Sequence, residues 1–286
     1  MYEFLRLLGA TVVLRPYVFS FLAVYLIAGR LHMGWKKTLL YIPLGYALAW
    51  FSEYASIHWG FPYGDYFYIH TTIHRELWVL GVPFMDSLSY VFLSYCSYSL
   101  AVFLMSPVRI KSKTLLTGES PNIRRSKSVL FLGAFLFVLL DIIIDPVALQ
   151  GRKWFLGLIY GYRHNGFYFG IPMSNFGGWL LVGLVLTAAL QALDRIDSKE
   201  AHYFVSGAKG SWLRLLGPLL YFSVLVFNMT ITFHVGAMLL GLVDLLLLAT
   251  LIVPMFFFTV YKITDPSLPL PSDPLGHPGK QVGRKV

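Results

Sequence analysis

The chain has 286 residues, of which 57% are hydrophobic, 17% are aromatic and only 13% are charged, and its formal net charge is +9. This composition excludes an ordinary soluble domain and indicates an integral membrane protein. The single cysteine, Cys96, excludes an intrachain disulfide and a metal site built from clustered cysteines.

Seven apolar stretches have the length, or nearly the length, of about 20 residues that a helix needs to cross a bilayer. They lie at residues 11–28, 38–52, 82–105, 128–144, 172–193, 213–233 and 237–261. The predicted fold class is therefore all-α, a polytopic membrane helix bundle of about seven transmembrane helices in one domain at residues 1–262. Residues 263–286 are polar and rich in proline, so we expect a disordered cytoplasmic tail there.

Lysine and arginine are distributed unevenly over the predicted loops. With the N-terminus outside, 17 of the 23 basic residues fall on the inner side. The positive charge is then a topology signal that also attracts anionic lipid, and it does not indicate nucleic-acid binding. We expect a multi-pass protein of the cell inner (cytoplasmic) membrane with a cytoplasmic C-terminus. This topology places the following acids toward the outer face: Glu53, Asp65, Asp86, Asp141, Asp145 and Asp244.

The segment at residues 53–68, EYASIHWGFPYGDYFY, is too rich in glycine, proline and aromatics for a regular helix. Trp and Tyr favour the headgroup level, and irregular backbone at membrane depth must be covered by protein or line a cavity. We expect an interfacial aromatic loop, part of which covers a pocket; the alternative is an aromatic belt without a ligand. Its candidate site residues are Glu53, Trp59, Tyr63, Asp65, Tyr66 and Tyr68.

Polar residues follow one face of the third predicted helix. Asp86, Tyr90, Ser94 and Ser97 fall within about 80° of arc at 100° per residue. For the two serines we expect hydrogen bonds between helices, which serine commonly makes in membranes. Asp86 is a candidate substrate-binding residue, because an acid in this setting is costly unless it is paired or wetted.

The motif DIIIDP places Asp141 and Asp145 one turn apart on one face of the fourth helix, about 6 Å between side-chain bases. Two carboxylates this close in a low dielectric cannot both ionise cheaply, so the pair is expected to hold a proton at neutral pH. Pro146 is expected to end the helix. Alternatively, one acid caps the loop or pairs with Arg152 or Arg163.

The stretch after this motif brings more polar and aromatic residues to the outer face. Pro172 suits the first turn of the fifth helix, and Gly177 and Gly178 would allow a neighbouring helix or ligand to come close. Asp244 could pair with His234 or take part in chemistry. The candidate binding residues of this region are Tyr168, Ser174, Asn175, Phe176 and Asp244.

Three stretches carry a family resemblance: FSEYASIHWGFPYGDYFY, DIIIDPVA and GFYFGIPMSNFGGW. Over about residues 51–193 the chain resembles the carotenoid biosynthesis proteins of the CruF type, the membrane carotenoid 1',2'-hydratases, with which bisanhydrobacterioruberin hydratase is grouped. The resemblance implies addition of water, without a cofactor, to the terminal double bond of an acyclic carotenoid end group such as that of lycopene or γ-carotene. It transfers no catalytic residues.

The residues fit this chemistry independently. Protonating the less substituted carbon of the alkene gives a tertiary cation that captures water, and Asp141 and Asp145 are the predicted donor and its partner. Glu53, Asp65 or Asn175 is expected to position the water. Aromatic faces stabilise a cation, and the candidates are Trp59, Tyr63, Tyr66, Tyr68, Tyr168 and Phe176.

Other functions remain open at this point. A di-iron hydroxylase is disfavoured because the eight histidines are scattered, and a magnesium-diphosphate enzyme would need a second, denser aspartate motif. A membrane transporter, or a non-catalytic scaffold for pigment or lipid, is the main alternative. The partners expected for a hydratase are a carotenoid, water, membrane lipid and other carotenoid enzymes, with neither a metal nor a cofactor.

Overall fold

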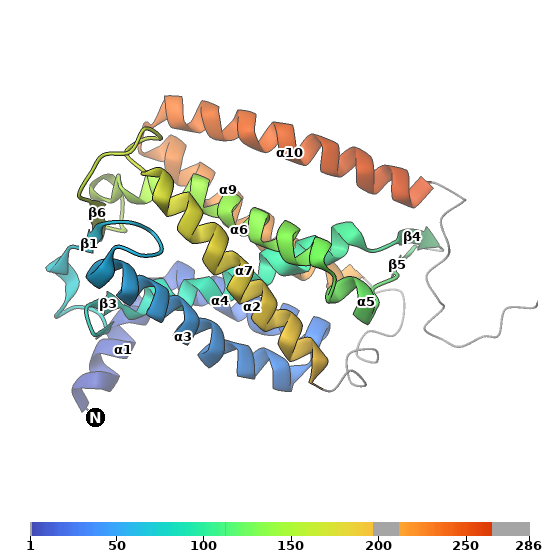
Figure 1. Cartoon of the computed structure of the whole chain (residues 1–286), viewed down its shortest axis with the longest axis horizontal. Coiled ribbons are helices and arrows are strands. Elements are labelled where there is room, and N and C mark those ends of the chain that lie inside the picture. Colours follow the sequence, from blue (N-terminus) through green and yellow to red (C-terminus); the bar gives the residue numbers. More distant parts are fainter. Residues whose placement is uncertain (1, 112, 197–211, 265–286) are drawn as a thin grey trace, which may run out of the picture.

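The computed structural model describes residues 2–111, 113–196 and 212–264, and these are mostly helical (Figure 1). The helices are α1 (Tyr2–Leu14), α2 (Pro16–Met33), α3 (Trp35–Trp59), α4 (Phe84–Met105), α5 (Pro121–Arg124), α6 (Lys127–Ala148), α7 (Met173–Arg195), α9 (Leu216–His234) and α10 (Met238–Thr264). Short 3-10 turns lie at His70–Thr72, Gly151–Lys153 and Leu213–Leu215.

Six short strands form three separate antiparallel pairs. Strand β1 (Tyr66–Tyr68) pairs with β6 (Tyr160–Tyr162), β2 (Trp78–Val79) with β3 (Val82–Pro83), and β4 (Val108–Lys111) with β5 (Thr114–Thr117). The β1 and β6 pair joins two loops that are far apart in the sequence and lies at one end of the bundle (Figure 1).

Helix α4 is the centre of the bundle. It contacts α2, α3, α6, α7 and α9, and most of its residues are buried. The predicted interhelical role of its serines is seen at Ser94, which shares a 2.6 Å hydrogen bond with Tyr41 of α3. Ser97 instead donates to the carbonyl of Leu93 in its own helix at 2.8 Å.

Six of the described helices are long and apolar enough to cross a membrane: α2, α4, α6, α7, the segment Leu213–His234 that contains α9, and α10. Helix α3 has 25 residues and packs against α2, α4 and α7, but its polar residues make it less apolar. The all-α polytopic membrane bundle is therefore confirmed, and α3 brings the number of long helices to the predicted seven.

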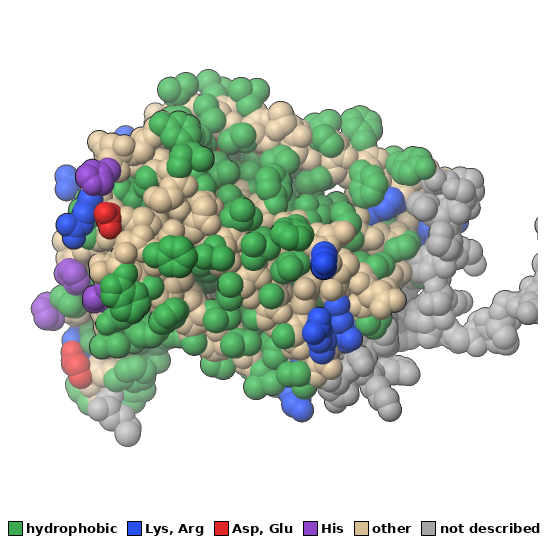
Figure 2. Space-filling view, viewed as in Figure 1, with side chains coloured by type: hydrophobic (Ala, Val, Ile, Leu, Met, Phe, Trp, Pro, Cys, Tyr) green, Lys and Arg blue, Asp and Glu red, His purple; other side chains and the backbone are tan. Residues whose placement is uncertain are grey.

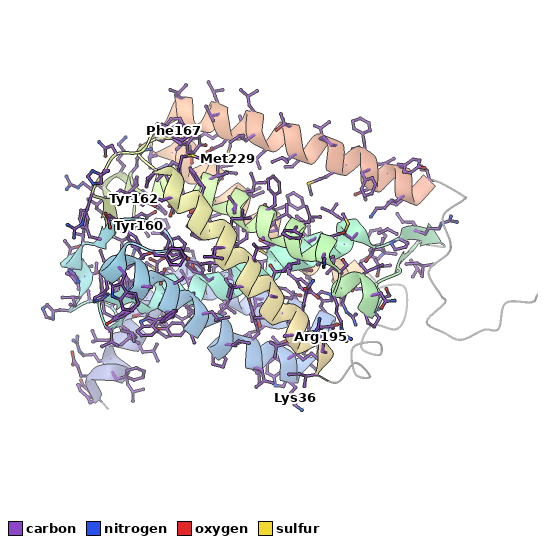
Figure 3. All side chains as sticks on the ribbon, viewed as in Figure 1. Lys36, Tyr160, Tyr162, Phe167, Arg195 and Met229 are labelled. Carbon is purple, nitrogen blue, oxygen red and sulfur yellow. The ribbon has the colours of Figure 1, made fainter. Side chains whose placement is uncertain are left out.

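Charged side chains gather at the two ends of the molecule, and hydrophobic side chains cover the face between them (Figure 2). Figure 3 shows Lys36 and Arg195 at one end and Tyr160 and Tyr162 at the other. This distribution is the one expected of a protein whose middle faces lipid. The chain is a multi-pass membrane protein.

The first predicted span is wrong as a single helix, because the chain breaks at Arg15 between α1 and α2. The Arg15 side chain is fully buried, and it donates to both carboxylate oxygens of Glu76 at 2.9 and 2.8 Å and to the carbonyl of Leu156 at 2.6 Å. Pro16 then opens α2, where its missing N–H leaves no bond unmade. The Arg15 side chain thus connects the N-terminal segment to two later loops, to one by an ion pair with Glu76 and to the other by a hydrogen bond to Leu156 O.

Three other predicted boundaries also differ. The second helix spans Trp35–Trp59, well beyond residues 38–52, and ends where Gly60 takes a left-handed conformation with φ of 69°. Helix α6 runs through Pro146 to Ala148, because the hydrogen-bond ladder resumes with Leu149 N–H donating to Asp145 O at 2.9 Å. Helix α10 reaches Thr264, and the rest of the predicted tail lies outside the described residues.

Removing one partner of the buried Arg15 and Glu76 pair should be strongly destabilising. Arg15→Gln leaves the Glu76 carboxylate buried without its partner, so we expect the free energy of unfolding in detergent micelles to fall by about 3–5 kcal/mol. Adding Glu76→Gln removes the stranded charge and should recover most of this loss. Arg6→Gln at the exposed Arg6 and Glu3 pair is the control, and its effect should be much smaller, because solvent screens an exposed ion pair. Equal effects of Arg15→Gln and Arg6→Gln would contradict this interpretation.

Candidate functional site

Four tyrosines lie on one face of the β1 and β6 pair. The register places Tyr66 opposite Tyr162 and Tyr68 opposite Tyr160, and alternate residues of a strand point to the same side. The rings of Tyr66 and Tyr68 are in edge contact at 5.3 Å, and those of Tyr160 and Tyr162 at 6.0 Å. These four tyrosines, the tyrosine sheet, line a cavity together with Glu53, Asp86 and Asp145.

Asp145 receives three hydrogen bonds near the end of α6. The hydroxyls of Tyr160 and Tyr162 donate to its two carboxyl oxygens, each at 2.8 Å, and the side-chain amide of Asn175 in α7 donates at 2.9 Å. Asn175 also donates to Asp141 Oδ2 at 2.9 Å, while Asp141 Oδ1 is buried without a hydrogen-bond partner among the described residues. One amide therefore bridges the two carboxyls of the DIIIDP motif.

A second pair of acids lies on α3 and α4. Asp86 accepts a hydrogen bond from the hydroxyl of Tyr68 at 2.7 Å. Glu53 is 2% exposed and accepts a short hydrogen bond from the hydroxyl of Ser87. Strand β1 thus covers one acid pair and strand β6 covers the other.

Two cavities meet at these carboxyls. A polar cavity of about 40 Å³ lies beneath the tyrosine sheet and is lined by Glu53, Tyr63, Tyr66, Tyr68, Asp86, Tyr90, Asp145, Tyr160, Tyr162, Asn175 and Trp179. A mainly apolar cavity of about 100 Å³ lies among α2, α4, α6, α9 and the loop before β6. Both cavities are lined by Asp86, Tyr90, Asp145, Tyr160 and Trp179. The acids therefore stand where an apolar space adjoins a polar one.

The four hydroxyls of the tyrosine sheet have raised pKa values. Burial raises the pKa of Tyr160 and of Tyr162 well above the ordinary value, and the negative charge of Asp145 adds to the rise. Burial also raises the pKa of Tyr66 and of Tyr68, with Glu53 the next cause for Tyr66 and Asp86 for Tyr68. At neutral pH these hydroxyls are donors, as the carboxyls beneath them require.

Most of the residues selected from the sequence meet in this cluster. Those that line the polar cavity or bond to it are Glu53, Tyr63, Tyr66, Tyr68, Asp86, Asp141, Asp145 and Asn175. Gly178 permits this arrangement as expected, since a Cβ there would lie 2.6 Å from the ring of Tyr63 and 2.7 Å from Pro62 O. No neighbouring helix approaches Gly177 in the same way, because a Cβ there would have no described atom of a neighbouring segment within 4 Å. Among the described residues, the side-chain hydrogen-bond partners of Asp141 and Asp145 are Tyr160, Tyr162 and Asn175, so the alternative of a pair with Arg152 or Arg163 is not seen.

The structure places three other selected residues outside the cluster. Trp59, Asp65 and Ser174 line a separate, open hollow of about 410 Å³ on the outer surface, together with His164. Trp59 is 68% exposed, and Asp65 is also exposed. Asp65 is therefore not among the acids that meet at the two cavities: it lies just before β1, where Tyr66 is buried and Asp65 is exposed.

A third group joins the β6–α7 loop to α10. The hydroxyl of Tyr168 donates to Asp244 Oδ1 at 3.5 Å, and its ring contacts Phe176 at 5.8 Å. The Asp244 side chain is fully buried, and its partner is Tyr168 and not His234. This group lines neither of the two cavities.

Sequence reasoning missed several residues of the cluster. Tyr160 and Tyr162 carried one signal, because YGY repeats the YFY spacing of residues 66–68 and both would present two tyrosines on one side of a strand. Ser87 and Trp179 carried no signal beyond their neighbours in the chain. In the described part of the chain, no group of three or more His, Cys, Asp or Glu side chains is arranged to hold a metal ion.

The raised tyrosine pKa values predict a stability that falls in alkali. Above the ordinary tyrosine pKa of about 10, the unfolded chain loses phenolic protons that the folded chain keeps, so stability decreases as pH rises toward the raised folded values. Changing Tyr160 and Tyr162 to Phe removes two of these groups. The melting temperature of this double variant should therefore fall less steeply above about pH 10 than that of the wild type. Tyr2→Phe, at an 81% exposed position, is the control, and parallel curves for wild type and double variant would contradict the assignment.

Residues 9–254 match the model of a family described as carotenoid biosynthesis protein. Neither the comparison with curated proteins nor the comparison with solved structures finds a significant match. The family match spans most of the chain and includes every residue that lines the polar and the apolar cavity. The chain belongs to the carotenoid biosynthesis protein family.

Proposed function

We propose that the protein is a membrane carotenoid hydratase. It adds water to the terminal (1,2) double bond of an acyclic end group, of the lycopene or γ-carotene type, and gives a tertiary alcohol without a cofactor. Membership of the carotenoid biosynthesis family supports the substrate class. The resemblance of its three motifs to the 1',2'-hydratases supports the reaction type.

One observation carries the proposal: an apolar cavity and a polar cavity share the carboxyls of Asp86 and Asp145 in their walls. Hydration of an alkene joins a hydrocarbon to water, so its catalyst needs a proton donor at the boundary between the two. A polar cavity of about 40 Å³ is large enough for a water molecule. The apolar cavity of about 100 Å³ suits a small hydrocarbon end group.

Asp145 is the proposed proton donor, and Asp141 is its partner. Two carboxyls bridged by one amide nitrogen in a buried site share a proton more readily than they ionise together. The O–H bond of Asp145 breaks, and the π electrons of the alkene form a C–H bond between that proton and the less substituted carbon. The neighbouring carbon becomes a tertiary cation, and Asp145 is left as a carboxylate. Tyr160, Tyr162 and Asn175 position that carboxylate through their three hydrogen bonds.

The cation forms next to aromatic rings. Tyr90 and Trp179 lie in the wall shared by the two cavities, and their rings are stacked with centroids 4.9 Å apart. Aromatic faces stabilise a cation by about 0.5–2 kcal/mol each without trapping it covalently. Water from the polar cavity then bonds to the cation through its oxygen and releases one proton to a carboxylate of the cluster.

The rest of the polyene needs more room than the apolar cavity offers. The cavity is bounded on its α2 and α9 side by Tyr17, Phe21 and Phe227, which are partly buried. The rings of Tyr17 and Phe21 each contact the ring of Phe227. We propose that the chain of the carotenoid leaves the cavity along these helices toward lipid. Membrane lipid and other carotenoid enzymes are then the natural neighbours of the protein.

We further infer the orientation from the distribution of charge. Lys36 and Arg195 lie at the end of the bundle opposite the tyrosine sheet (Figure 3). By the positive-inside rule this basic end, with the C-terminus, faces the cytoplasm, and the acid cluster faces the outer side of the inner (cytoplasmic) membrane. In this proposal, residues 1–262 form one membrane domain and residues 263–286 form a cytoplasmic tail.

The test is hydration of lycopene under argon by membranes that contain the protein, in water labelled with oxygen-18. We expect the label in a tertiary alcohol and no requirement for oxygen. An alcohol that needs oxygen would contradict the proposal in favour of a hydroxylase. Absence of any alcohol, with the protein folded in the membrane, would favour a transporter or a scaffold.

The acid assignment predicts that Asp145→Asn and Asp141→Asn each abolish hydration. Both substitutions keep a side chain of similar shape but remove the transferable proton, so we expect the rate to fall by about 10²-fold or more. Membrane insertion and melting temperature should stay close to wild type. The matched control is Glu3→Gln, at an exposed carboxyl of α1. Wild-type rates in both aspartate variants would remove the assignment.

A further inference from the structure

The second acid pair, Glu53 and Asp86, also lines the polar cavity, and proton donation by Asp145 gives this pair no role. Asp86 and Asp145 are the two carboxyls that line both cavities. They come from different helices, α4 and α6, and each accepts a hydrogen bond from a different tyrosine. These tyrosines, Tyr68 and Tyr160, are directly opposite one another in the β1 and β6 register. The tyrosine sheet therefore holds one carboxyl on each side of the junction.

Each of these carboxyls also has a second acid close by. Asp141 lies one turn before Asp145 and shares its Asn175 donor. Glu53 lines the polar cavity together with Asp86 and is held by the hydroxyl of Ser87, the residue next to Asp86. Water in the polar cavity thus has acids on two sides, and one pair is sufficient to supply the proton.

We propose that Asp86 is the general base of the reaction, with Glu53 as a positioning residue for the same water. This inference rests on the proposed hydratase function. When Asp145 has given its proton to the alkene, a lone pair of the water oxygen forms the C–O bond at the tertiary cation. One O–H bond of that water breaks, and its proton passes to the Asp86 carboxylate.

The cycle closes when the proton on Asp86 returns to Asp145. The path runs through the polar cavity, whose wall contains both carboxyls and the hydroxyls of Tyr68 and Tyr160. Each cycle consumes one water molecule. One C–H bond and one C–O bond form, one O–H bond of the water remains in the alcohol, and no net proton is taken up. The acid, Asp145, and the base, Asp86, are therefore different residues. The test must distinguish loss of the acid from loss of the base.

The experiment follows two signals from lycopene in D₂O with membranes of the wild type, Asp86→Asn and Asp145→Asn. The first signal is the amount of tertiary alcohol. The second is deuterium in the recovered carotenoid, measured by mass spectrometry, which reports cations that formed and then lost a proton before water was captured. Asn at position 86 still offers an oxygen to the Tyr68 hydroxyl, so the tyrosine sheet should stay in place.

For Asp86→Asn we expect alcohol formation to fall by about 10²-fold or more, while deuterium still enters the recovered carotenoid. Asp145→Asn should lose both signals, because no cation forms. A purely structural role of Asp86 would remove both signals as well, so that outcome in Asp86→Asn overturns the proposal. Alcohol formation by Asp86→Asn at close to the wild-type rate also overturns it.

Two controls show whether a loss of alcohol formation in Asp86→Asn results from the loss of the base or from misfolding. Glu3→Gln, an exposed carboxyl change on α1, should match the wild type in both signals. Melting temperature and membrane content show whether Asp86→Asn is folded. If the wild type itself forms neither alcohol nor deuterated carotenoid, the hydratase function fails, and this outcome is distinct from the failure of Asp86 alone.

Discussion

The site depends on one constraint: carboxyl groups enclosed in an apolar helix bundle must be met by hydrogen-bond donors. Water cannot supply these donors freely at this depth, and an unpaired buried polar group costs several kcal/mol. The tyrosine sheet supplies hydroxyls to Asp86 and Asp145 from outside the helices, and Asn175 bridges Asp141 and Asp145 from α7. The irregular loops after α3 and α6 are therefore as necessary to the site as the helices that carry the acids.

The same arrangement creates the boundary on which the proposed chemistry relies. The tyrosine sheet lines the polar cavity, and Tyr90 and Trp179 line both the polar and the apolar cavity. A hydrocarbon end group and a water molecule can then approach the same two carboxyls from different sides. Because the donors are fixed by strand pairing and helix packing, the site needs little reorganisation when charge develops.

Patterns that are local in the sequence predicted the structure well, and contacts between distant segments did not follow from them. Hydropathy located the long helices, and the four-residue spacing of Asp141 and Asp145 placed both acids on one helix face. The break at Arg15 was missed because its cause, Glu76, lies 61 residues away. Tyr160 and Tyr162 were missed because only their pairing with β1 turns them toward Asp145. Asp65 was grouped with the acids because of its neighbours in the chain, although it lies just before β1 and is exposed.

The most direct measurement of the central claim is an experimental structure of the protein with an acyclic carotenoid bound. We expect the terminal double bond to occupy the apolar cavity, within about 3–3.5 Å of the Asp145 carboxyl, with the polyene passing along α2 and α9. A carotenoid bound elsewhere on the bundle, with its end group remote from both Asp86 and Asp145, would overturn the proposed site.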